Sequence, residues 1–117
     1  PARACFAEAF FGMTVPDAIK EKTKAELLLG MAALGRHGKF APYVAGDSLS
    51  VADLYFLYSV PLACGVAHKL FGIDLLAEVP QAKVLLERLE QNPNVQRIAA
   101  DKDAAMPAFM AMVASRK

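Results

Sequence analysis

The chain has 117 residues, enough for one domain with a hydrophobic core. Apolar residues make up 56% and charged residues 21% of it, a composition that excludes a disordered chain. Thirteen basic and twelve acidic residues give a formal net charge of +1, which argues against nucleic-acid binding because that function needs a clustered basic surface. We therefore expect one globular domain over residues 1–117.

Apolar residues recur at helical spacing along the chain and hardly alternate with period two, so no strand is expected. The fold class predicted from this pattern is all-α, with about five to six helices around a buried central helix. The predicted helices cover about residues 2–12, 14–38, 51–70 and 80–91, followed by a short helix opened by Asn92-Pro93 and a last helix from about Asp103.

The helix over residues 14–38 has start signals and one unusual position. Thr14 is expected to cap its N-terminus, and Pro16 is expected to occupy its first turn. Gly30 lies within its apolar stripe, where glycine costs about 1 kcal/mol relative to alanine. We therefore expect another helix to approach closely at Gly30.

The helix over residues 51–70 is the most apolar segment and is expected to be fully buried. Its longest stretch without a formal charge, residues 54–67, is shorter than the roughly 20 residues that a membrane span needs. Pro61 is expected to kink the helix, because proline removes a backbone hydrogen bond and crowds the preceding turn. These features favour a core helix and no association with a membrane.

The sequence has two cysteines and two histidines, residue types that can be reactive or bind metals. Cys5 and Cys64 lie in apolar runs, and we expect reduced thiols packed in the core. His37 and His68 are expected at helix ends, with no thiol or carboxylate at ligand spacing. The sequence therefore predicts no metal site and no catalytic residue in this chain.

The start of the central helix carries a specific capping pattern. Ser50 is a good N-cap residue and Asp53 follows three positions later, as in a capping box where each side chain accepts from the other residue's backbone N–H. Leu49 and Leu54 have the spacing of a hydrophobic staple. The sequence therefore predicts a capped helix start at Ser50, which matters because a buried helix end cannot bond its N–H groups to water.

Three motifs in order resemble the C-terminal helical domain of glutathione transferases, and the resemblance covers essentially the whole chain. The segment 43–53 (YVAGDSLSVAD) is similar to the one that opens the central helix in that family. The proline-initiated segment 79–84 (VPQAKV) and the turn 92–95 (NPNV) follow in the family's order. The resemblance implies a family-like helical bundle belonging to a longer chain, in keeping with the missing initiator methionine.

The resemblance also implies where the chemistry of the parent protein lies. In this family glutathione, the co-substrate, is bound mainly by an N-terminal thioredoxin-like domain that supplies the activating Tyr, Ser or Cys. That domain is not found in this sequence, and it would be the partner of this one in the same chain. Tyr43, Tyr55 and Tyr58 are accordingly expected to pack in the core or in a loop.

In the family the helical domain contributes the apolar wall of the electrophile pocket, from its first and last helices. The corresponding residues here would bind apolar small molecules, for which methionine and aromatic side chains are well suited. Residues at helical spacing also fit plain core packing, so both interpretations stay open. The candidate pocket residues are Phe6, Phe10, Met13, Met106, Phe109 and Met110.

Three functions are compatible with these observations. The first is that the parent protein is a cytoplasmic, homodimeric glutathione transferase that acts in detoxification by conjugating the glutathione thiolate to apolar electrophiles. This chain would then line the pocket, contribute to the dimer interface and be inactive alone. The second is a non-catalytic interaction module like the stringent-starvation, elongation-factor and synthetase-associated relatives. The third is an autonomous helical bundle with an accidental likeness.

Overall fold

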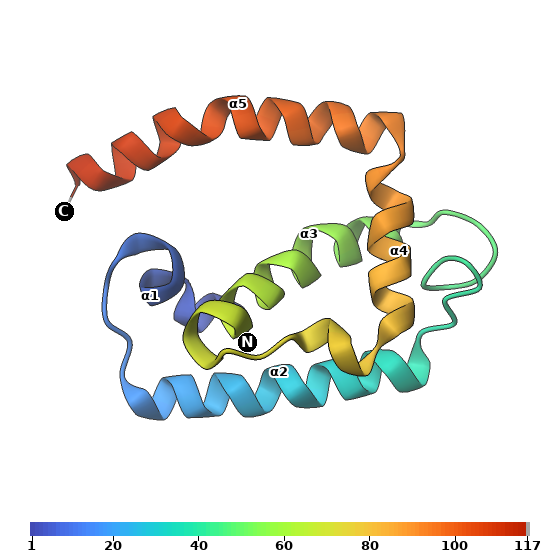
Figure 1. The fold of residues 1–117 in the computed structure, drawn as a ribbon, viewed down its shortest axis with the longest axis horizontal. Helices are drawn as coiled ribbons and strands as arrows, with labels where there is room; N and C mark the ends of the chain where they lie inside the picture. Colours follow the sequence, from blue (N-terminus) through green and yellow to red (C-terminus); the bar gives the residue numbers. More distant parts are fainter. Residues whose placement is uncertain (117) are drawn as a thin grey trace.

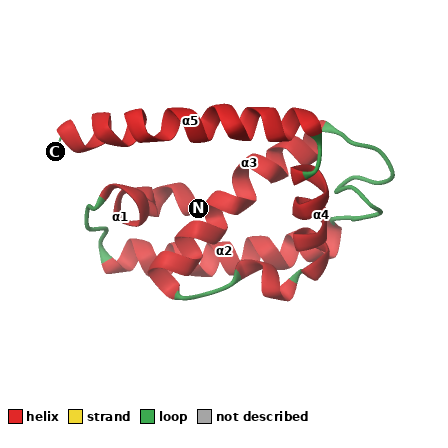
Figure 2. Ribbon diagram, turned by 45° about the horizontal axis from the view of Figure 1, so that its top comes forward, coloured by secondary structure: helices red, strands yellow, loops and turns green. Residues whose placement is uncertain are grey.

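The computed structural model describes residues 1–116, which form five α-helices and three short helical segments of other types (Figures 1 and 2). Among these residues there is no strand, so the predicted all-α class is confirmed. The order along the chain is η1 (Ala2–Cys5), α1 (Phe6–Phe11), α2 (Asp17–His37), α3 (Val51–Val66), η2 (Ala67–Phe71), η3 (Leu75–Glu78), α4 (Pro80–Glu90) and α5 (Pro93–Ser115).

Helix α3 lies between two long helices (Figure 1). Helix α2 runs along one long edge of the molecule and α5 along the other, while α4 crosses at one end and α1 lies at the opposite end. Helix α3 contacts α1, α4 and all three short segments. Its predicted central position is therefore confirmed.

The core is formed mainly by residues of α2, α3 and α4, and α2 contacts the short segments η1, η2 and η3. Helical spacing predicts an apolar face on α4, and all four of its residues are buried. The stripe predicted for α2 is confirmed in part, because Thr23, Leu27 and Met31 are buried whereas Ile19 and Gly30 are exposed. The buried apolar residues of these helices are Leu27 and Met31 in α2, Phe56, Leu57 and Val66 in α3, and Ala82, Leu85, Leu86 and Leu89 in α4.

Helix α3 is central but not fully buried, so that prediction is wrong. One flank faces the core, whereas the opposite flank is exposed, with 73% of Tyr55 and 65% of Val51 accessible. The sequence misled because α3 is apolar all round, which indicates burial on every side. The helical residues Val51–Phe71 have the length and composition of a possible membrane span, with mean hydropathy 1.3, but a core helix of a soluble protein can meet the same criteria.

Two predictions for α2 are wrong: the cap at Thr14 and the close approach of another helix at Gly30. Thr14 is exposed and caps nothing; Pro16 is the N-cap residue, and its carbonyl accepts from the N–H groups of Ile19 and Lys20 at 3.0 and 3.1 Å. The connection to α1 is held instead by Glu8, whose carboxylate accepts from the Val15 N–H at 3.1 Å and pairs with Lys20 at 3.3 Å.

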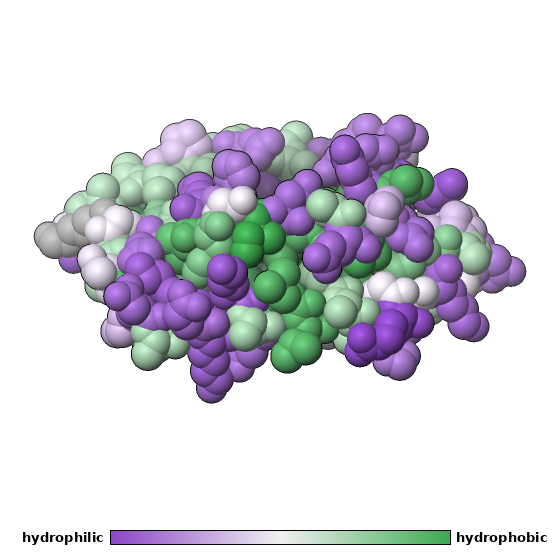
Figure 3. Space-filling view, turned by 60° about the horizontal axis from the view of Figure 1, so that its bottom comes forward, coloured by the Kyte–Doolittle hydropathy of each residue, from purple (hydrophilic) through white to green (hydrophobic). Residues whose placement is uncertain are grey.

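Gly30 is exposed, and a Cβ atom added there would meet nothing within 4 Å. No helix therefore approaches closely at this position. Figure 3 shows the face reached by turning the α2 edge of the molecule forward, where hydrophobic atoms are mixed with hydrophilic ones. The exposed surface of α2 also includes larger apolar residues such as Leu29, which is 71% exposed.

The two helices predicted after Asn92 are a single helix, α5. Asn92 caps it as predicted, since its side-chain oxygen accepts from the Asn94 N–H at 2.9 Å. No break occurs before Asp103, because the intervening Ala99 and Ala100 are strong helix formers. Helix α3 likewise continues past Pro61 to Val66.

Candidate functional site

The start of α3 is fixed by a buried carboxylate. Asp53 is completely buried, and its Oδ2 accepts from the backbone N–H of Ser50 at 2.8 Å. The Ser50 side chain faces the backbone of Asp53, so both halves of the capping box are present. The other carboxylate oxygen, Oδ1, accepts from the Val44 N–H at 2.9 Å. Asp53 thus joins the helix start to the preceding loop, in addition to capping the helix.

The staple residues shield this start only partly, because Leu49 is 48% and Leu54 is 42% exposed. The loop itself packs on the core through Tyr43, which is half-buried as expected and lies 5.8 Å from the Arg88 guanidinium of α4. The Ser50–Asp53 pair is therefore a structural site that sets the position of the α3 N-terminus relative to α4.

An apolar pocket of about 440 Å³ lies between α1, α3, η2 and α5. Five of the six candidate pocket residues surround it, although they come from opposite ends of the chain. Met13 is not among its lining residues and is 60% exposed. The complete lining is Phe6, Phe10, Phe11, Leu62, Lys69, Met106, Phe109 and Met110.

Aromatic contacts hold the walls of this pocket in place. The rings of Phe6 and Phe10 meet edge to face at 5.4 Å between centroids, and those of Phe11 and Phe109 at 6.5 Å. The second pair joins α1 to α5, and such pairs contribute about 0.5–1.5 kcal/mol beyond area burial. Gly65 of α3 lies beneath Phe10, since an added Cβ would be 3.4 Å from the Phe10 Cζ.

Three lining residues were missed by sequence reasoning. Phe11 adjoins a predicted residue, and Leu62 lies on the exposed flank of a helix that was expected to be buried. Lys69 is the one ionisable residue of the lining. Its Nζ donates to the Ala9 carbonyl at 3.2 Å and lies 4.8 Å from the Phe10 ring centroid. No motif in the sequence could have indicated a contact between residues about 60 positions apart.

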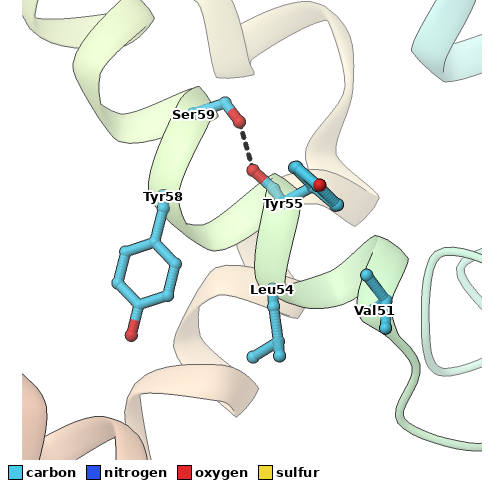
Figure 4. Close-up of a pocket in the computed structure, with 5 residues that line it drawn as sticks. All are labelled: Val51, Leu54, Tyr55, Tyr58 and Ser59. Carbon is cyan, nitrogen blue, oxygen red and sulfur yellow. Dashed lines mark hydrogen bonds between the residues drawn. The ribbon is translucent and has the colours of Figure 1, made fainter.

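A second hollow, of about 350 Å³, lies on the exposed flank of α3 (Figure 4). All of its lining residues come from this helix, so it is shallow and has no opposite wall. Tyr55 and Tyr58 belong to it and are 73% and 50% exposed, which shows that the prediction of core packing is wrong for both. Ser59 bonds the Tyr55 carbonyl within the helix. This hollow offers a flat apolar surface, whereas the pocket between α1 and α5 has walls from several elements.

The cysteines and histidines form no reactive centre. Cys5 is completely buried as predicted, and Cys64 is half-buried. Burial raises the pKa of the Cys64 thiol above its ordinary value, and the negative charge of Asp74 adds to this. A raised pKa disfavours the nucleophilic thiolate. His37 and His68 are both exposed. Across residues 1–116, no group of three or more His, Cys, Asp or Glu side chains could hold a metal ion.

The pocket offers a mainly apolar binding surface with one amine, that of Lys69. Its lining has no thiol, hydroxyl, imidazole or carboxylate. Its volume is within the range of about 300–1,000 Å³ that is usual for small-molecule sites. Fold and site together define an all-α domain with an apolar pocket, built from helices at both ends of the chain.

Comparison with known proteins identifies the family to which this domain belongs. The family described as "Glutathione S-transferase, C-terminal domain" matches residues 9–101. The chain therefore belongs to the C-terminal domain family of the glutathione S-transferases, as its motifs predict. A protein named glutathione S-transferase from Pseudomonas putida is 57% identical over 117 residues, which are 100% of this chain and 53% of that relative. The chain thus spans about half the length of the curated relative it matches.

Proposed function

We propose that this chain is the electrophile-binding half of a cytoplasmic glutathione transferase. In the complete protein, an N-terminal thioredoxin-like domain would bind glutathione and activate its thiolate. The pocket between α1 and α5 would hold an apolar electrophile for attack by that thiolate, a reaction typical of detoxification. The relative from Pseudomonas putida, which bears this enzyme name and is about twice as long, supports the proposal.

The observation that carries the proposal is the convergence of α1 and α5 on one pocket. Residues 6–11 and 106–110 are separated by nearly the whole chain, yet they line one space of about 440 Å³. Core packing alone does not account for this arrangement, because Met106, Phe109 and Met110 are 39–44% exposed. Exposed apolar side chains around an open space are typical of a ligand site.

The test is a kinetic comparison in the complete protein. Replacing Phe109 by alanine should raise KM for an apolar aryl halide roughly tenfold, since one lost apolar contact is worth about 1–3 kcal/mol. KM for glutathione should change less than about twofold, because glutathione binds elsewhere. Ile98→Ala is the matched control on the same helix, outside the pocket. Equal effects of the two substitutions, or equal changes in both KM values, would contradict the proposed role.

The isolated 117-residue chain should not conjugate glutathione to an aryl halide, because in this family the residue that activates the thiol belongs to the N-terminal thioredoxin-like domain. We further propose that the exposed flank of α3 packs against the thioredoxin-like domain. Hydroxyl-radical footprinting should then oxidise Tyr55 in the isolated chain and protect it in the complete protein. Leu29, on the opposite edge, should be labelled equally in both. Equal labelling of Tyr55 would rule this contact out.

We also propose that the complete protein is a homodimer to which this domain contributes, which sedimentation equilibrium tests directly. The exposed flank of α3 supports a second candidate function, a non-catalytic module that binds another protein through this surface. A complete protein without conjugating activity, and with Tyr55 protected only when another protein is bound, would favour the second candidate over the enzyme.

A further inference from the structure

We propose that the pocket between α1 and α5 selects apolar molecules that carry one negative group, which pairs with the Lys69 ammonium. The inference rests on the proposed function of this pocket and specifies its ligand class. The ligand would have an apolar body and a single carboxylate or sulfonate, as in an aromatic acid.

The charge pattern of the lining is the first support. Seven of the eight lining residues are apolar and the eighth is Lys69. No acidic residue lines the pocket, and the ion pairs found among residues 1–116 involve Lys20 and Lys22 only. The Lys69 charge is therefore not neutralised by a described carboxylate within 4 Å. An apolar site with one uncompensated cation attracts an anionic ligand more strongly than its neutral analogue.

The position of the ammonium group is the second support. Its contacts with the Ala9 carbonyl and the Phe10 ring hold it against the pocket wall in the absence of a ligand. An ammonium has three N–H donors, and a single acceptor atom is described for this one. Donors therefore remain for a ligand. Because Phe10 contacts both Lys69 and the pocket, an aromatic body and its negative group can bind side by side.

The experiment uses two fluorescent probes that differ in one charged group. 8-Anilinonaphthalene-1-sulfonate carries a sulfonate, and N-phenyl-1-naphthylamine is the same skeleton without it. Each is titrated into the 117-residue chain, and the dissociation constants are compared. The sulfonate should bind about two- to fivefold more tightly than the neutral probe, as expected for a partly exposed ion pair. This preference should decrease as ionic strength rises.

Variants assign the preference to Lys69. Lys69→Gln should weaken sulfonate binding about two- to fivefold and leave the neutral probe unchanged, while Lys69→Arg should keep the preference. Lys83→Gln, which removes an exposed charge of α4 outside the pocket, is the control. Phe109→Ala should weaken both probes, which would place them in this pocket. A loss of both probes in Lys69→Gln would mean that Lys69 only supports the wall, and would overturn the inference.

The outcomes separate this inference from the proposed function. If neither probe is weakened by Phe109→Ala, the pocket binds no apolar ligand and both proposals fail. If the neutral probe binds there as tightly as the sulfonate, only the ligand class is wrong. Glutathione is also an anion, so it is added as a competitor. Displacement of the sulfonate by glutathione in the wild-type chain but not in Lys69→Gln would assign Lys69 to the peptide and would overturn the inference.

Discussion

Helices α4 and α5 begin alike and are held very differently. Each has proline in its first turn, after Val79 and Asn92 respectively. Helix α4 has 11 residues, of which four are buried, whereas α5 has 23 residues and none is buried. Helix α4 therefore belongs to a packed side of the molecule, together with the start of α3. Helix α5, the apolar pocket and the outer flank of α3 form an open side.

The comparison shows that this fold separates stability from binding. Residues that hold the domain together are the buried ones of α2, α3 and α4, and those proposed to bind ligand lie on segments with few buried residues. Regions with few buried apolar contacts have the lowest local stability. The aromatic contact between Phe11 and Phe109 holds α5 to α1 on this open side. Four comparisons, each of a packed position with a more exposed one, test this separation.

The largest difference is expected for apolar truncations of α4 and α5. Leu85→Ala removes a side chain that is 1% exposed and should lower the free energy of unfolding by about 2–5 kcal/mol. Ile98→Ala on α5, where the side chain is 53% exposed, should cost less than about 1 kcal/mol. Urea denaturation followed by circular dichroism measures both. Similar costs would show that α5 is as firmly packed as α4 and would remove the basis of the comparison.

The next pair concerns two aspartates near the start of α3. Asp53→Ala leaves the N–H groups of Ser50 and Val44 without their acceptor, which should cost about 2–3 kcal/mol because a buried unpaired donor costs about 1–3 kcal/mol. Asp47 is exposed on the same loop, and Asp47→Ala should stay within about 0.5 kcal/mol of the wild type. Ser50→Ala should fall between them, near 1 kcal/mol. Thermal unfolding ranks the three, and any other order would show that Asp53 acts only as a cap.

The packed side was the part that the sequence predicts well. The leucine face of α4 and the capped start at Ser50 depend on neighbours within a few positions, and such local patterns determine secondary structure directly. No local pattern specifies which distant helices meet. The expectation that α1 and α5 line one pocket therefore came from the family resemblance alone. The contact of Lys69 with Phe10 has no such source and was missed.

The wrong predictions concern the open side or a helix end. Helical spacing reports which residues are apolar but not whether this chain covers them, so Tyr55 and Gly30 were placed against neighbours that are not there. Thr14 has the residue type of a cap, but the carboxylate of Glu8 binds the connection in its place. In each case the environment of the residue depends on whether a segment distant in sequence packs against it. A local sequence pattern does not contain this information.

The third pair compares two glycines of α2. Gly30→Ala adds a methyl group to open space within a helix, so it should stabilise the domain by about 0.5–1 kcal/mol through helix propensity. The Cβ of Gly35→Ala would lie 3.3 Å from Val79 Cγ2 on the packed side, so much of the same gain should be lost to crowding. Differential scanning calorimetry of both variants measures this difference. A larger gain at Gly35 would mean that the contact of α2 with Val79 is looser than the structure shows.

The smallest effects are expected for the two thiols, which differ in exposure. Cys5 is fully buried and should resist iodoacetamide in the native state, whereas half-buried Cys64 should react slowly. Because burial raises the Cys64 pKa, its alkylation near pH 8 should be slower than that of free cysteine and should accelerate as pH rises. The raised pKa also makes stability depend on pH. The Cys64 thiol makes its full contribution to the free energy of unfolding below pH 9.0, its ordinary pKa, and this contribution is lost as pH rises through the higher pKa of the folded state. Mass spectrometry of timed alkylation assigns each site. In the Cys64→Ala variant, the pH-dependent alkylation of the native domain should be absent. Faster labelling of Cys5 than of Cys64 would reverse the order of the packed and open sides.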